Sequence, residues 1–130
     1  MELTKAEEQI MHILWKLENA FVKDIIDKLP SPKPAYNTVS TIVRILEKKG
    51  FVDYKAFGKA HQYHPIVTKK EYTGKFMRGF IMSYFENSYR QMVSFFAKEE
   101  NLSVKEMEEI IALLSDKLDK KKKDGNSEHI

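Results

Sequence analysis

The stretch that decides the fold runs from Pro34 to Gly50 and reads P-A-Y-N-T-V-S-T-I-V-R-I-L-E-K-K-G. Its spacing predicts one amphipathic helix, because apolar side chains gather on one side at about 100° per residue. These apolar residues are Ala35, Val39, Ile42, Val43 and Leu46. The opposite side carries short hydrogen-bonding side chains and cations, namely Asn37, Thr41, Arg44 and Lys48, with Thr38 and Ser40 at its margins.

This polar face fits the major groove of DNA. There, Asn, Ser, Thr and Arg side chains reach base edges and phosphates. An ordinary surface helix mixes Glu with Lys on its solvent side, whereas here Glu47 lies near the edge of the apolar side. We therefore predict DNA contacts from this helix. The alternative is a solvated face that happens to lack acidic residues.

Positive charge is concentrated around the same helix. Residues 1–70 carry 12 Lys or Arg and 8 Asp or Glu, a balance of +4, whereas residues 71–130 carry 10 and 11, a balance of −1. Within 30–64, six cations against two acids give the same +4. This is the pattern of a surface that faces a polyanion. The six cations are Lys33, Arg44, Lys48, Lys49, Lys55 and Lys59.

Two shorter helices precede the principal one. The segment from Thr4 to Glu7 reads as a capping box, with a helix after it that reaches about Leu17. Helical spacing predicts a second helix over 22–29, and the prolines of 30–34 end it, because proline lacks the amide hydrogen.

After Gly50, which suits the C-terminal cap of the principal helix, the apolar period changes to two. Residues 51–56 and 60–64 therefore predict a β-hairpin joined by 57–59. Three helices followed by a hairpin make a winged helix-turn-helix, in which the third helix reads DNA. Lys59 at the turn and Lys55 near it are expected to contact phosphate.

The remaining chain predicts further helices with an apolar excess. Capping boxes stand at 68–71 and 103–106, and the segment 86–88 suits a break between helices. About 55 residues with this many aromatic side chains cannot bury them alone. We expect an intertwined homodimer; the alternatives are packing against the winged helix or a hydrophobic ligand. The expected interface residues are Phe76, Phe80, Tyr84, Phe85, Met92, Phe96, Ile110 and Leu114.

The sequence thus predicts a mostly α protein. A winged helix-turn-helix DNA-binding domain over 1–68 precedes a helical dimerisation domain over 69–122, and 123–130 form a disordered tail. The expected partners are double-stranded DNA and a second copy of the chain.

Catalysis and metal binding are not expected. The chain has no cysteine, hence no thiolate metal site, and no nucleophile elbow or phosphate loop. His61 and His64 lie three apart on a strand, so they point to opposite faces. We predict no enzyme, no cofactor and no metal. Without a signal peptide or a membrane span, we expect a cytoplasmic protein that does not contact lipid membranes.

Taken together, these residues resemble the BlaI/MecI family of penicillinase repressors, to which the copper-responsive CopY repressors are related. The matching fragments are T-x-A-E-x-x-I-M-x-I-L-W (Thr4 to Trp15), V-K-D-I (Val22 to Ile25), N-T-V-S-T-I-V-R-I-L-E-K-K-G-F-V (Asn37 to Val52), G-K-A-H-Q-Y-H-P (Gly58 to Pro65) and K-E-E-N-L-S (Lys98 to Ser103). The combination of a first helix that ends in Trp with the T-V-x-T core of the third helix is absent from generic winged helices.

The resemblance implies a dimeric repressor that binds a short dyad operator. In the β-lactam branch of the family, a membrane-bound sensor with a metalloprotease domain leads to cleavage within the dimerisation region. Cleavage weakens the dimer, so the two half-sites lose their linked binding. An antibiotic-resistance regulon is one implied target, although family members serve other regulons too.

By position, Thr38 and Thr41 match the family's threonines, and Arg44 matches a commonly basic position. Lys59 replaces the usual wing arginine and lacks its bidentate fork, so we expect a phosphate contact only. The cysteine pairs of the copper branch are absent. The family's Asn-Phe cleavage site is altered to Phe95-Phe96, which is the possible cleavage site here.

Another class of function remains open: a winged helix that binds only proteins and no nucleic acid. An acidic or apolar outer face on 35–49 is typical of such a module, and the sequence shows the reverse.

Overall fold

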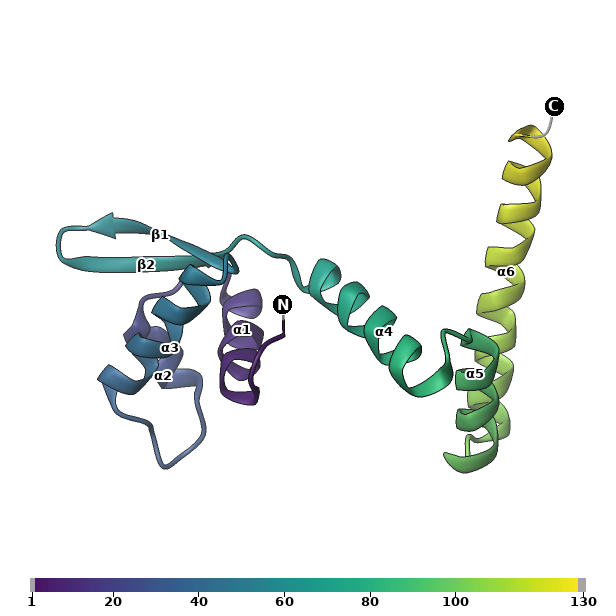
Figure 1. The fold of residues 1–130 in the computed structure, drawn as a ribbon, viewed down its shortest axis with the longest axis horizontal. Coiled ribbons are helices and arrows are strands. Elements are labelled where there is room, and N and C mark those ends of the chain that lie inside the picture. The colour runs from purple at the N-terminus through teal and green to yellow at the C-terminus, as the bar shows by residue number, and fades with distance from the viewer. Residues whose placement is uncertain (1, 129–130) are drawn as a thin grey trace. The chain divides into compact units, whose positions relative to one another are not determined.

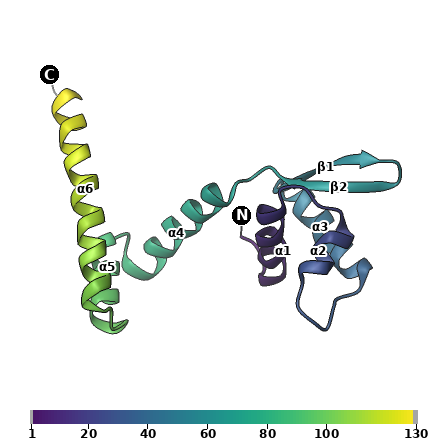
Figure 2. The same ribbon diagram turned by 180° about the vertical axis from the view of Figure 1, so that it is seen from behind.

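A computed structural model describes residues 2–128, in which six helices accompany one antiparallel two-stranded hairpin (Figures 1 and 2). The elements are α1 (Lys5–Leu17), α2 (Val22–Lys28), α3 (Tyr36–Lys48), β1 (Val52–Phe57), β2 (Ala60–Pro65), α4 (Lys69–Phe85), α5 (Tyr89–Glu99) and α6 (Val104–Glu128). The chain divides into two compact units, Met1–Met77 and Arg78–Ile130. The predicted order of three helices, a hairpin and further helices is confirmed.

The helix α1 begins at the predicted capping box. The backbone N–H of Glu7 donates to Thr4 Oγ1 at 3.1 Å, and the N–H of Thr4 donates to Glu7 Oε1 at 2.9 Å. These bonds satisfy two of the N–H groups that a helix start leaves without partners. The helix then buries Ile10, Met11 and Leu14.

The helix α3 is anchored by its apolar face and closed by glycine. Val39, Val43 and Leu46 are fully buried, as the periodicity predicts. Beyond the helix, Gly50 has φ +82°, its N–H donates to Glu47 O, and the N–H of Phe51 donates to Leu46 O. This pair of bonds is the Schellman motif, which favours glycine at the left-handed position. The helix start differs from the prediction, because Ala35 is an exposed N-cap residue and not part of the apolar face.

The hairpin pairs Val52 with Pro65 and Phe57 with Ala60, so only Gly58 and Lys59 form its loop. The φ of Gly58 is +62°, as a type II′ two-residue turn requires at its first position. At the other end, Tyr63 exchanges two backbone hydrogen bonds with Ala20, of 2.9 and 2.7 Å. The segment between α1 and α2 therefore fixes the base of the hairpin.

One core joins α1, α2, α3 and the hairpin, which lie side by side in both views of the ribbon. Each element contributes fully or nearly fully buried apolar side chains. The core residues are Ile10, Met11, Leu14, Ala20, Val22, Ile25, Leu29, Val39, Val43, Leu46, Phe51, Val52 and Tyr63.

The second unit buries far fewer side chains. Glu86 and Asn87 have φ +51° and +61°, which ends α4 in the predicted segment, and Ser88 caps α5. The predicted boxes at Thr68 and Ser103 are both formed. The helix α6 has no buried side chain in its described part. Its large exposed apolar residues are Val104, Met107, Ile110, Ile111, Leu113, Leu114 and Leu118.

The predicted domain limits stay predictions. The first compact unit extends to Met77, and the predicted end of the winged-helix domain lies at residue 68. The stretch 123–130 is predicted to be a disordered tail, yet α6 continues through Glu128; residues 129–130 lie outside the described residues. An ion pair from Lys120 to Asp116, 3.3 Å long at i,i+4 spacing, supports the last turns of this helix. No described helix is both long enough and apolar enough to cross a bilayer.

A buried ion pair connects the first helix to the end of the third. Lys49 Nζ lies 2.7 Å from Glu7 Oε1, and the two side chains are 24% and 6% exposed. Burial acts to raise the pKa of Glu7, but the hydrogen bonds from Lys49 and Thr4 outweigh it and hold the pKa below 4.5. Because the folded state favours the charged carboxylate, this contribution to stability is complete above pH 4.5 and disappears as the pH falls below it.

We expect Glu7→Gln to lower the free energy of unfolding at pH 7 by about 1–3 kcal/mol, since it removes the charge from a buried hydrogen-bonded pair. When the pH is lowered from 7 to below 4.5, the free energy of unfolding should also fall less in the variant than in the parent. Urea unfolding at several pH values measures both quantities. The control is Asp27→Asn, which neutralises an exposed carboxylate. If acidification lowered the free energy of unfolding equally in Glu7→Gln and in the parent, this role of the pair would be contradicted.

Candidate nucleic-acid interface

The outer face of α3 carries five of its six predicted DNA-binding residues in exposed positions. They are Asn37, Thr38, Thr41, Arg44 and Lys48. The side opposite is fixed in the core, so the helix cannot turn this face away without breaking the first unit. Tyr36 is also exposed, at 59%, although it is not among the predicted DNA-binding residues. Its place at the first helical residue could have indicated it, since residues at the start of a recognition helix contact base edges.

The sixth residue, Ser40, differs from the prediction. Its side chain is only 7% exposed, because position 40 lies beside Val39 and Val43 on the helix surface. Its Oγ accepts a hydrogen bond of 3.2 Å from Arg44 Nη2. Ser40 therefore holds the guanidinium against the helix and does not itself present a group to solvent.

The hydroxyl of Thr41 is also used within the helix. Its Oγ1 donates to the backbone oxygen of Asn37 at 2.8 Å. The exposed side chain thus offers a methyl group and an acceptor oxygen. A methyl group in the major groove can contact the methyl group of thymine, and the oxygen can accept from an amino group of adenine or cytosine.

The charge of this surface is smaller than the sequence count suggests. Lys33 Nζ donates to the backbone oxygens of Leu29 and Asp27, at the end of α2. Lys49 is paired with Glu7. Lys33 and Lys49 are therefore already bonded to oxygen atoms of the fold. Arg44, which also donates to Ser40, and Lys48, Lys55 and Lys59 are exposed.

The hairpin places two of these cations near its turn. Lys59 is exposed in the loop, and Lys55 Nζ lies 5.7 Å from the ring centroid of Phe57. Phe57 is half exposed and packs edge-on against Phe21 at 5.9 Å. The hairpin tip therefore combines two cations with the exposed ring of Phe57, which is not among the predicted site residues.

The histidines of the hairpin have separate surroundings. His61 stacks on Tyr54, with ring centroids 4.0 Å apart and an angle of 8° between the rings. His64, three positions further along β2, faces the other side of the hairpin. It is paired with Asp53 in the strand register. Within residues 2–128, no three His, Asp or Glu side chains gather as a metal site would need.

The residues predicted for the dimer interface lie in α4, α5 and α6 with large exposed areas. Phe76, Tyr84, Phe96, Ile110 and Leu114 are exposed, and Phe80, Phe85 and Met92 are half-buried. The aromatic rings form a contact series from Phe80 through Phe85 and Phe95 to Phe96, each step 5.8–5.9 Å. An apolar surface of this extent is typical of a surface that another protein covers.

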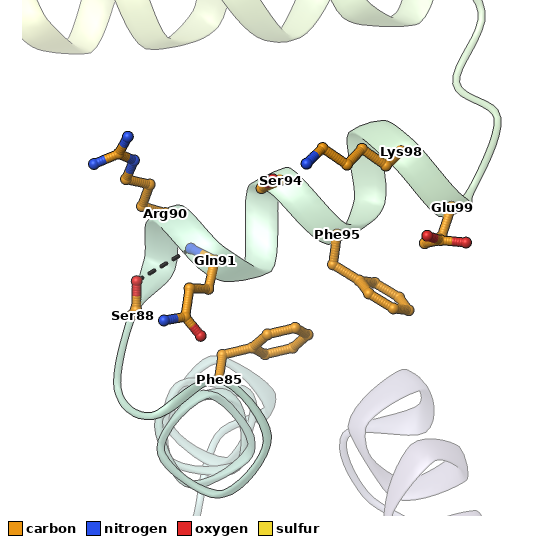
Figure 3. A pocket seen from close by; sticks show the side chains of 8 residues that line it. All are labelled: Phe85, Ser88, Arg90, Gln91, Ser94, Phe95, Lys98 and Glu99. Atoms are coloured by element: carbon orange, nitrogen blue, oxygen red, sulfur yellow. Dashed lines mark hydrogen bonds between the residues drawn. The ribbon is translucent and has the colours of Figure 1, made fainter.

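A groove of about 600 Å³ lies between the end of α4 and α5, with Phe85 and Phe95 pointing toward one another across it (Figure 3). The possible cleavage site, Phe95-Phe96, is therefore part of a helix, with one of its rings on the wall of a groove. The other lining residues are Ser88, Arg90, Gln91, Ser94, Lys98 and Glu99.

Comparisons with known proteins show which family the sequence belongs to. A family model described as penicillinase repressor matches residues 3–116. The methicillin resistance regulatory protein MecI of Staphylococcus aureus is 31% identical over 117 residues, which cover 89% of this chain and 95% of that protein. The penicillinase repressor of Bacillus licheniformis is 25% identical over 126 residues, covering 93% and 95%. These relatives are regulatory proteins and not enzymes.

Proposed function

The chain belongs to the penicillinase repressor family and is a transcriptional repressor, and we propose that it acts as a homodimer on a two-fold symmetric DNA operator. In this proposal the face of α3 that carries Asn37, Thr41 and Arg44 enters the major groove. The hairpin lies along the phosphate backbone, with Lys55 and Lys59 as phosphate contacts. Binding to chromosomal DNA would place the protein in the cytoplasm.

The observation that carries the proposal is that one side of α3 is buried in the core and the opposite side is polar and exposed. Val39, Val43 and Leu46 are buried in the core, while the face opposite is exposed and has cations but no carboxylate. Glu47, the one acid of the helix, is half-buried beside the apolar face. A helix fixed in this way presents its polar side chains at defined positions, as base recognition requires.

We infer a homodimer because one copy alone offers few base contacts. A single winged helix makes too few base contacts for strong specificity, and two copies related by a two-fold axis double them. The exposed apolar residues of α5 and α6 supply a surface for that association. The two α3 helices would then enter successive major grooves, about 34–36 Å apart.

For release from DNA we propose cleavage between Phe95 and Phe96 on a signal from a membrane-bound sensor protease. Cleavage there would separate α6 from α4, remove much of the apolar surface and weaken the dimer. Each half-site would then bind alone and lose the benefit of linked binding. Because both residues lie within α5, the protease needs this helix to open locally first.

The proposal is tested by DNA selection with the intact protein, followed by a salt titration on the selected duplex. We expect log K to fall linearly with log salt concentration, because phosphate contacts release counterions. Arg44→Ala should cost about 1–3 kcal/mol and relax the preference at one base position. Lys59→Ala should weaken binding to all sequences about equally. A chain that selects no duplex even at low salt would instead be a protein-interaction module.

The dimer is tested by Leu114→Glu. Leu114 is 56% exposed in the single chain, so a charge there leaves the fold of the chain intact but opposes an apolar interface. We expect monomers in sedimentation experiments and a large loss of operator affinity. Ile66→Glu is the matched control, since Ile66 is similarly exposed but lies in the first unit. Dimers of unchanged affinity in Leu114→Glu would show that this face packs elsewhere.

Cleavage is tested by intact-mass analysis of the repressor before and after induction of its host cells. We expect a new fragment that ends at Phe95. If the repressed genes were induced while only the intact chain was recovered, release would need another cause.

A further inference from the structure

The start of α4 is held on the winged-helix unit by a group of three aromatic side chains, Trp15, Phe51 and Tyr72, which we name the aromatic clamp. The ring of Tyr72 lies 5.7 Å from Trp15 and 5.9 Å from Phe51. Trp15 belongs to α1, and Phe51 follows α3 directly. All three side chains lie within the first compact unit.

Hydrogen bonds fix the clamp at two points of the chain. The hydroxyl of Tyr72 donates to Glu8 Oε2 at 3.0 Å, and Trp15 Nε1 donates to the backbone oxygen of Val67 at 2.9 Å. Between these points Thr68 caps the first turn of α4. Burial, together with the bond to Glu8, raises the pKa of Tyr72 to about 12, so the hydroxyl keeps its proton at neutral pH and remains a donor.

Two anchors on consecutive parts of the chain restrain a direction as well as a position. The bond to Val67 holds the residue two before α4, and Tyr72 holds the first turn. The helix α4 belongs to the first unit as far as Met77, so the two anchors fix the direction in which the chain leaves the winged-helix core.

We propose that Tyr72 is a positioning residue for operator binding: by fixing the first turn of α4 on the winged-helix unit, it sets the half-site spacing that the dimer accepts. This inference rests on the proposed homodimer. The chemistry that DNA meets is unchanged by Tyr72, since the residue contacts α1 and Phe51 and not the outer face of α3. Tyr72 instead affects which spacing of two half-sites allows both α3 helices of the dimer to bind at the same time.

The experiment uses the full-length chain and duplexes that carry its selected half-site as an inverted repeat. The spacing between the half-sites is changed one base pair at a time, and affinities are measured for the parent, Tyr72→Ala and Tyr72→Phe. We expect the parent to prefer one spacing over its neighbours by at least about tenfold, and Tyr72→Ala to reduce this ratio to about threefold or less. Tyr72→Phe keeps the ring and loses the bond to Glu8, so it should lie between them.

Leu29→Ala is the control for stability, because Leu29 is buried directly after α2 and is not one of the clamp residues. It should lower the melting temperature and leave the spacing preference unchanged. If Tyr72→Ala does not fold, as circular dichroism would show, Tyr72→Phe decides the matter by the same ratio. An unchanged ratio in the folded Tyr72 variants, or an equally reduced one in Leu29→Ala, would overturn the inference alone. A parent that selects no duplex would overturn the proposed function and this inference with it.

Discussion

The burial of one side of α3 is the constraint on which the rest of the structure depends. Val39, Val43 and Leu46 are fully enclosed by α1, α2 and the hairpin, and the Schellman motif at Gly50 sends the chain directly into β1. Rotating α3 would expose these three side chains at a cost of about 1.5–3 kcal/mol each. The orientation of the polar face is therefore set by the hydrophobic core and needs no interaction of its own.

Contacts within the fold decide which lysines are already bonded. Lys33 and Lys49 donate to oxygen atoms at the end of α2 and on α1, whereas Arg44 and Lys48 lie exposed on α3. The distinction matters because a lysine that is already paired must break that pair before it can neutralise a phosphate. A basic surface of four cations per copy is modest, which fits a dimer that combines two such surfaces.

In our proposal the first unit provides sequence specificity and the second provides association between two copies. The first unit is closed around one core, whereas the second leaves most apolar side chains of α6 exposed. The first unit therefore contains the helix that we propose reads DNA, and the second exposes the apolar surface that we propose a second copy covers. In our proposal, association raises the affinity for the operator only when both α3 helices can bind their half-sites at the same time.

Local features of the fold were predictable from the sequence by itself. The capping boxes at Thr4, Thr68 and Ser103, the glycine cap at Gly50 and the change of period after it depend on neighbours within a few positions, so sequence spacing contains them. The same spacing predicted most of the residues of α3 that face solvent, but it did not predict that Tyr36 is exposed and Ser40 buried, or that the N-cap residue Ala35 is exposed. Only the tertiary structure decided that Lys49 is paired with Glu7, that Ser40 holds Arg44, and that the first unit extends to Met77. The Lys49 pair and the Tyr72 contacts that carry the first unit into α4 join residues 42 and 64 positions apart, and Ser40 is buried because the core closes over one edge of α3. Helical periodicity carries no information about such distant contacts, because they arise only when separate elements pack together.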